Sequence, residues 1–168
     1  MKQKRLFLLS GIPGSGKSTW IKNQIEAKGG IWISRDAIRF AALSEEDEYF
    51  SKEDEVFATF ISAIQEQINN PIATDIYVDA SHLNTKARNK TLRRLNLEGL
   101  DEKNCVCFQI PLEIAFERND QRSGRALVPH SVIAEMAKSL TLPKANEKFD
   151  HIIVIDEFGN KKEVEPNE

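Results

Sequence analysis

The sequence has little of several features that mark specialised classes of protein. It holds two cysteines in 168 residues, too few for a disulfide scaffold. The apolar run at 6–9 is too short for a signal peptide or a membrane span. With 40% hydrophobic and 29% charged residues, the chain is neither disordered nor collagen-like. We therefore expect a reduced, cytoplasmic protein without membrane association, and the sequence indicates no protein partner.

A strong excess of positive charge is also missing. The formal net charge is −3, which excludes a general nucleic-acid coat. The acidic residues are concentrated, however, with seven in 44–55 and five in 156–168. The remaining residues include 20 basic and 14 acidic side chains, a formal charge of +6. The sequence therefore still permits an enzyme that grips one end of a nucleic-acid strand.

Short apolar runs alternate with helical patterns along the chain. We expect strands at 5–9, 31–33, 75–78, 104–110 and 151–155. We expect helices at 17–28, 36–42, 56–68, 85–97, 112–121 and 129–140. Strands that are apolar from end to end and alternate with helices predict a parallel sheet covered on both faces. Cys105 and Cys107 share one face of such a strand, where we expect two small buried residues rather than a disulfide.

A phosphate-binding loop is the most specific motif. Residues 11–18 read Gly-Ile-Pro-Gly-Ser-Gly-Lys-Ser, which matches G-x-x-x-x-G-K-[ST] between a strand and a helix. Glycines let the backbone wrap around phosphate, and the helix N-terminus offers partial positive charge. The expected nucleotide-binding residues are Gly11, Gly14, Ser15, Gly16, Lys17, Ser18 and Thr19. The loop predicts binding of ATP with Mg²⁺ on Ser18, but it does not identify the acceptor.

Ligands of parallel sheets bind at the carboxyl ends of the strands, so polar residues there are candidates. Asp36 follows the second strand and is either a general base or a helix N-cap, and Arg39 is either a clamp for an acceptor phosphate or a surface residue. Asp79 ends the third strand and is either a residue of the metal region or a turn aspartate. For His82 we expect polar surface rather than catalysis.

Two further segments are basic. Arg118, Arg122 and Arg125 suggest a lid that neutralises charge during phosphoryl transfer, although a solvated helix end is the alternative. On the expected helix 85–97, the residues Lys86, Lys90 and Arg93 can share one face. That face is either solvated or in contact with the phosphate backbone of an acceptor strand.

Taken together, four segments resemble the kinase domain of polynucleotide 5′-kinases of T-even phage and bacteria. They are the phosphate-binding loop, Ser-Arg-Asp-Ala-Ile-Arg at 34–39, Val-Asp-Ala-Ser-His-Leu-Asn at 78–84, and Arg-Asn-Asp-Gln-Arg-Ser-Gly-Arg-Ala-Leu-Val-Pro at 118–129. We therefore expect an α/β P-loop kinase fold with a five-stranded parallel sheet in the order 2-3-1-4-5 and an Arg-rich lid. We expect one domain over 1–156 and a polar tail at 157–168.

The resemblance implies ATP-dependent phosphorylation of a 5′-hydroxyl on DNA or RNA. Lys17 and Ser18 would serve the triphosphate and Mg²⁺, and Asp79 would support the metal region. Asp36 would be the general base and Arg39 the acceptor-phosphate clamp. Arg122 is our choice for the lid arginine, with Arg125 as the alternative. A P-loop kinase of a nucleoside, sugar or nucleotide-sugar is the second hypothesis, and a non-catalytic nucleotide-binding module is the third.

Overall fold

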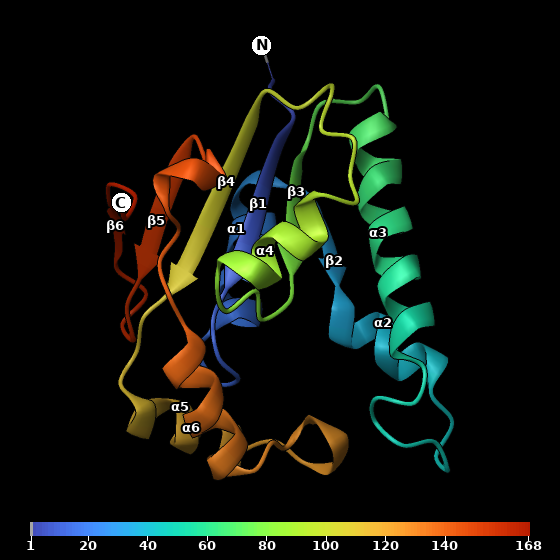
Figure 1. Cartoon of the computed structure of the whole chain (residues 1–168), viewed down its shortest axis with the longest axis vertical. Coiled ribbons are helices and arrows are strands. Elements are labelled where there is room, and N and C mark those ends of the chain that lie inside the picture. The colour runs from blue at the N-terminus through green and yellow to red at the C-terminus, as the bar shows by residue number, and fades with distance from the viewer. Residues whose placement is uncertain (1) are drawn as a thin grey trace.

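The computed structural model describes residues 2–168, and a six-stranded sheet forms its centre (Figure 1). The strands are β1 (Arg5–Ser10), β2 (Ile31–Ser34), β3 (Asp75–Asp79), β4 (Glu102–Phe108), β5 (His151–Ile155) and β6 (Lys161–Glu163). They lie in the order β2-β3-β1-β4-β5-β6, and the first five are parallel. The expected order of the five parallel strands is confirmed.

The helices are α1 (Lys17–Lys28), α2 (Arg35–Ala42), α3 (Glu53–Asn69), α4 (Thr85–Leu92), α5 (Leu112–Asp120) and α6 (His130–Ser139). Short 3₁₀ helices span Gly124–Ala126 and Ala145–Glu147. Helix α4 ends five residues before the expected end at residue 97, and turns bonded to Asn89, Thr91 and Leu92 follow it. Among residues 2–168, no helix has the length and apolar character needed to cross a bilayer.

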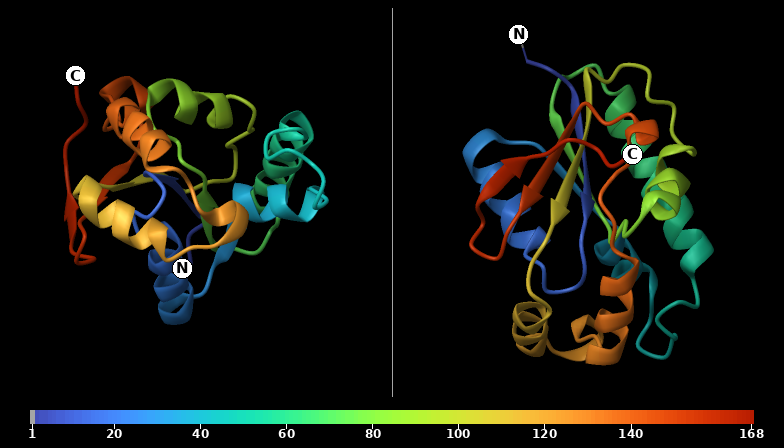
Figure 2. Two further views of the ribbon diagram at one scale, coloured as in Figure 1. Left: turned by 90° about the horizontal axis from the view of Figure 1, so that it is seen from below. Right: turned by 60° about the vertical axis from the view of Figure 1, so that its left-hand side comes forward.

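The sheet is covered on both faces, which explains why its five parallel strands are mostly apolar. Alternate residues of β1 belong to different cores: Leu6 and Leu8 pack with α3 and α4, and Phe7 and Leu9 pack with α1. Figure 2 shows α1 on one side of the sheet and α3 and α4 on the other. The expected burial of Cys105 and Cys107 is confirmed, and their exposed fractions are 0% and 2%.

The C-terminal segment departs from the expected polar tail. Residues Lys161–Glu163 form β6, which pairs antiparallel with β5. The side chains of β6 are exposed and polar, so the sequence has no apolar pattern there from which a strand could be predicted. Backbone bonds then join Asn167 to Pro143 and Ala145, which holds this end of the chain against the segment before β5.

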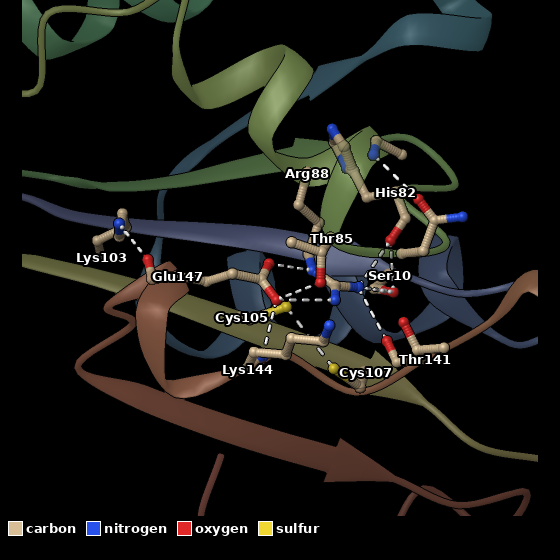
Figure 3. A network of polar contacts seen from close by, with 12 residues as sticks. Ser10, His82, Thr85, Arg88, Lys103, Cys105, Cys107, Thr141, Lys144 and Glu147 are labelled. Carbon is tan, nitrogen blue, oxygen red and sulfur yellow. Dashed lines mark hydrogen bonds and ion pairs between the residues drawn. The ribbon is translucent and has the colours of Figure 1, made fainter. Parts of the chain in front are cut away.

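A buried ion pair joins α4 to the segment before β5 (Figure 3). The Arg88 side chain is 0% exposed, and its Nε and Nη2 donate to the Glu147 carboxylate at 2.7 and 3.2 Å. The second carboxylate oxygen also accepts bonds from the Thr85 hydroxyl and the Lys144 backbone N–H. These contacts lower the pKa of Glu147 against the effect of burial, so the pair is charged on both sides.

The same guanidinium reaches the edge of the sheet near the phosphate-binding loop. Arg88 Nη1 donates to the carbonyls of Thr141 and His82 at 3.0 and 3.2 Å. The hydroxyl of Ser10, the last residue of β1, donates to the same His82 carbonyl at 2.7 Å. The pair thereby links the end of β1 to the β3–α4 connection and to residue 141.

We predict that Glu147→Gln lowers the free energy of unfolding by about 3–5 kcal/mol, because it leaves the Arg88 charge buried without a counter-charge. Urea denaturation followed by circular dichroism measures the change. The matched control is Glu135→Gln, because Glu135 pairs with Lys138 and both side chains are 73% exposed. The control should shift by less than about 0.5 kcal/mol. Equal losses in the two variants would contradict a special role for the buried pair.

Candidate functional site

The phosphate-binding loop connects β1 to α1 at the carboxyl edge of the sheet. Gly14 and Gly16 have φ values of +80° and +98°, a region that favours glycine. A Cβ on Gly14 would lie 2.4 Å from the Ala115 carbonyl oxygen, so this turn packs closely on α5. The loop geometry therefore favours glycine at both positions, of which the motif specifies Gly16 and leaves position 14 open.

Several features of this loop fit a bound phosphate. Helix α1 begins without a side-chain cap and without an acidic residue in its first turn. Its N-terminal N–H groups are therefore available to an anion. The Ser15 hydroxyl is buried and has no hydrogen-bond partner among the described residues, and Ser18 and Thr19 are exposed at the start of α1. These features are those that the triphosphate of ATP requires.

Lys17 folds back across the loop and donates from Nζ to the Gly11 and Ile12 carbonyls at 2.9 and 3.2 Å. Burial lowers its pKa, while the nearby carboxylates of Asp79 and Asp36 act in the opposite direction. The charge of Arg122 lowers this pKa as well. The structure thus brings Lys17, Asp36, Asp79 and Arg122 into electrostatic reach of one another.

Asp79 is the last residue of β3 and is mostly buried. Its carboxylate accepts a hydrogen bond from Trp32 Nε1 at 3.0 Å. Burial raises the pKa of Asp79, and Lys17 and the Trp32 bond lower it. With the Ser18 hydroxyl at the start of α1, this carboxylate supplies the oxygen donors that a magnesium ion prefers.

Asp36 lies in the first turn of α2 and is not its cap. The cap is Ser34, whose hydroxyl accepts from the Ala37 N–H at 3.1 Å. The Asp36 side chain is 63% exposed, and its carboxylate pairs with Arg39. It also accepts a bond from the Tyr49 hydroxyl at 3.0 Å. Burial and the charge of Asp36 raise the pKa of Tyr49 to about 12, so this hydroxyl remains a donor.

Arg39 is buried rather than on the surface. Besides Asp36, its guanidinium contacts both carboxylate oxygens of Glu53, with Nε at 3.1 Å from Oε2. It also donates to the Tyr49 hydroxyl at 3.0 Å and lies over the rings of Tyr49 and Phe50. The 44–55 segment is therefore part of the site, a role that its acidic composition alone does not assign, since such a composition is also typical of a solvated connection.

The three arginines of the expected lid have different neighbours. Arg118 donates to the Glu157 carbonyl at 2.7 Å and lies beside Gly16. Arg122 is exposed, and its positive charge lowers the pKa values of both Lys17 and Asp79. Arg125 donates to the carbonyls of Ser44, Glu45 and Asp47 at 2.7–2.9 Å. Of Arg122 and Arg125, it is Arg122 whose charge lowers the pKa values of Lys17 and Asp79, and its role in transfer stays a prediction.

Asn119 shapes this lid segment. Its side chain donates to the Val128 carbonyl at 2.6 Å and accepts from the Val128 N–H at 3.0 Å, which closes the loop between α5 and α6. His130 then stacks on Phe116 with ring centroids 4.1 Å apart and contacts Asp120. The sequence reading missed Asn119, since one amide beside three arginines carries no distinctive signal.

His82 is buried and is not polar surface. Its Nδ1 donates to the Leu9 carbonyl and its Nε2 accepts from the Thr91 hydroxyl, both at 2.9 Å. Burial lowers the pKa of His82 to about 3, although the Leu9 bond acts in the opposite direction. The neutral ring therefore connects β1 to α4 and has a structural role.

Comparison with known proteins places this arrangement in a family. The AAA domain family matches residues 6–143. The chain belongs to this family. A gluconokinase from Sinorhizobium meliloti 1021 is similar to this AAA domain with 21% identity and a TM-score of 0.60, over 93% of this chain and 84% of that one.

Two RNA-related structures are also similar to this AAA domain. A chain of the Pnkp1/Rnl/Hen1 RNA repair complex has 20% identity and a TM-score of 0.71, and the match covers 100% of this chain and 50% of that one. A fungal RNA kinase has 14% identity and a TM-score of 0.58, and that match covers 92% and 75%. At these identities the likeness shows the fold, which is the α/β P-loop kinase fold.

We predict that Gly14→Ala weakens nucleotide binding at least about tenfold, because the new Cβ displaces the loop from the Ala115 carbonyl. Titration with a fluorescent ATP analogue measures the dissociation constant. Gly159→Ala is the matched control: its φ of +81° is nearly that of Gly14, but no atom lies within 4 Å of the added Cβ. This control should lose about 1–2 kcal/mol of stability and keep its affinity. Unchanged binding by Gly14→Ala would contradict the assignment of the loop.

We also predict a pH dependence of stability that arises from His82. Its folded pKa, about 3, lies below its unfolded value near 6.5, so the unfolded state binds the proton first and stability falls as the pH drops below 6.5. The loss between pH 7 and pH 5 is about 2 kcal/mol. Urea unfolding of the wild type and of His82→Asn at both pH values isolates this contribution, because residue 82 has a φ of +39°, which asparagine tolerates. Equal pH dependence in both proteins would contradict it.

Proposed function

We propose that this protein is an ATP-dependent kinase that phosphorylates the 5′-hydroxyl end of DNA or RNA, with Mg²⁺ as cofactor. The observation that carries the proposal is the placement of the Asp36 carboxylate. It is 63% exposed, it is held by Arg39 and Tyr49, and its charge acts on Lys17 in the phosphate-binding loop. A general base needs this position, whereas a module that only binds nucleotide needs no base.

In the proposed reaction, the Asp36 carboxylate accepts the proton of the acceptor hydroxyl while that oxygen attacks the γ-phosphorus of ATP. The bond between the γ-phosphorus and the bridging oxygen breaks, and ADP leaves. Lys17 and Arg122 contribute positive charge beside the transferring group. Ser18 and Asp79 would hold the magnesium ion, which neutralises phosphate charge when bound.

Aromatic side chains beside Asp36 favour a nucleotide as the acceptor. Phe40, Tyr49 and Phe50 form a continuous group, with ring centroids 6.0 and 4.6 Å apart along the series. Phe40 is 37% exposed and Phe50 is 68% exposed, so both rings are accessible. Single-stranded nucleic acids are bound by stacking their bases on such rings, which supports a polynucleotide end rather than a sugar.

Arg39 is the proposed clamp for the acceptor phosphate, and it is engaged with Glu53 in this structure. A phosphate that entered beside Asp36 would accept hydrogen bonds from the Arg39 N–H groups that now donate to the Glu53 carboxylate. The Glu53 carboxylate and a phosphate can each accept two parallel hydrogen bonds from one guanidinium, so Arg39 can bind either of them. In this proposal Glu53 holds Arg39 in position until the acceptor arrives.

A kinase of a small molecule is the second candidate. Its support is the match to the gluconokinase, which covers 84% of that chain and so relates two proteins of similar extent. Labelled ATP and Mg²⁺, offered with 5′-hydroxyl oligonucleotides or with a panel of nucleosides and sugars including gluconate, separate the two candidates. Label on oligonucleotide ends supports the proposal, and label on a sugar alone supports the second candidate.

We predict that Asp36→Asn reduces kcat by about 10²–10⁴-fold, because the amide cannot accept the proton of the acceptor hydroxyl. Affinity for the ATP analogue should be unchanged, since Asp36 lies outside the phosphate-binding loop. Asp54→Asn is the matched control, because Asp54 is exposed on α3 and lies outside the proposed machinery. If Asp36→Asn kept its rate, or if both variants lost it equally, the assignment of the base would be wrong.

A further inference from the structure

Three cationic side chains surround the ring of Phe57, in the first part of α3: one comes from α2, one from α4 and one from the turn that follows α4. The cationic cluster consists of Arg35, Lys90 and Arg94. The charged ends lie 4.9, 5.0 and 5.4 Å from the ring centroid, in that order. Phe57 itself is only 7% exposed. Each cation is attracted electrostatically by the face of the ring, but the three together concentrate positive charge at one place.

The charge of the cationic cluster is poorly neutralised within residues 2–168. Lys90 and Arg94 form no ion pair with any described residue, and Arg35 reaches Glu53 only at 3.4 Å. Glu53 itself is engaged with Arg39. In addition, Arg35 Nε is buried and lacks a hydrogen-bond partner among the described residues. An unpaired buried donor beside uncompensated cations indicates that an anion belongs at this place.

The cluster continues directly from the proposed acceptor site. Arg35 precedes Asp36 in the chain, and Glu53 contacts both Arg35 and Arg39. Figure 1 shows α4 on the same face of the sheet as α3, whose first turn lies beside α2. The cationic cluster is therefore a charged surface that a longer acceptor meets after its 5′ end has reached Asp36.

We propose that the cationic cluster binds the phosphodiester backbone of the acceptor strand downstream of its 5′-terminal nucleotide. This inference rests on the proposed function. Evenly spaced phosphates provide the repeated negative charge that three neighbouring cations require. A sugar or a nucleoside 3′-phosphate, whose single phosphate the Arg39 clamp would take, offers no further phosphate to Lys90 and Arg94. The cluster thus confers a preference for strands of several nucleotides over single nucleotides, without reading their sequence.

The test compares K90A/R94A with wild type on two acceptors, a 5′-hydroxyl 12-mer and a nucleoside 3′-phosphate. We expect KM for the 12-mer to rise about tenfold and the dependence of log affinity on log salt to become shallower by about one. KM for the nucleoside 3′-phosphate and kcat for both acceptors should be unchanged. K90R/R94K keeps the charge and should keep most of the affinity. The matched control is K22A/K28A, which removes two exposed cations from α1 on the other side of the sheet.

Binding of a fluorescein-labelled 12-mer, followed by anisotropy, is measured separately from transfer. Weakened binding in K90A/R94A but not in K22A/K28A supports the inference even if no transfer occurs, in which case only the proposed function fails. Equal weakening in both double variants overturns it. Absence of any binding by the wild type overturns it as well, and so does an equal effect of K90A/R94A on the 12-mer and the nucleoside 3′-phosphate.

Discussion

Strand β1 is paired on both edges and covered on both faces, so the chain that leaves it must emerge at the carboxyl edge of the sheet. Its neighbours β3 and β4 are parallel to it, which brings their carboxyl ends to the same edge. The phosphate-binding loop, Asp79 and the start of α5 therefore meet there without any long-range reach of side chains. The packing of α5 on Gly14 then holds the loop against this edge. The bonds of Lys17 to the loop carbonyls depend on this placement of β1.

The acidic and the basic segments of the chain both contribute to the candidate site. The acidic 44–55 segment has the composition of a solvated connection. In the structure, however, Glu53 accepts hydrogen bonds from Arg39, and Tyr49 donates one to Asp36. The Glu53 carboxylate thereby holds two arginines, Arg35 and Arg39, beside the proposed binding site for anions. The basic face of α4 is likewise continuous with this site, since Lys90 shares the Phe57 ring with Arg35.

Much of this architecture is predictable from the sequence, because it follows from local patterns. Apolar strands, helical stripes and the glycines of the loop predict the main elements and the position of Lys17, and the resemblance to polynucleotide kinases implies the order of the five parallel strands. What the sequence reading missed depends on partners far away in the chain. Arg88 looks like one more exposed cation until Glu147, 59 residues later, meets it in the interior. Strand β6 has no apolar pattern, and His82 becomes structural only through Leu9 and Thr91.

The contacts of Arg125 have a consequence for how the site can change over evolutionary time. Its guanidinium holds the 44–47 segment through three main-chain carbonyls and through no side chain of that segment. Every residue type carries the same carbonyl, so a substitution at Glu45 leaves its contact in place, whereas the Asp47 side chain also accepts from the Ser44 N–H. Part of the segment next to the proposed acceptor site can therefore vary in sequence while Arg125 keeps its contacts. Such an arrangement lets one ancestral scaffold diversify in the acceptors it selects without rebuilding the part that handles phosphate.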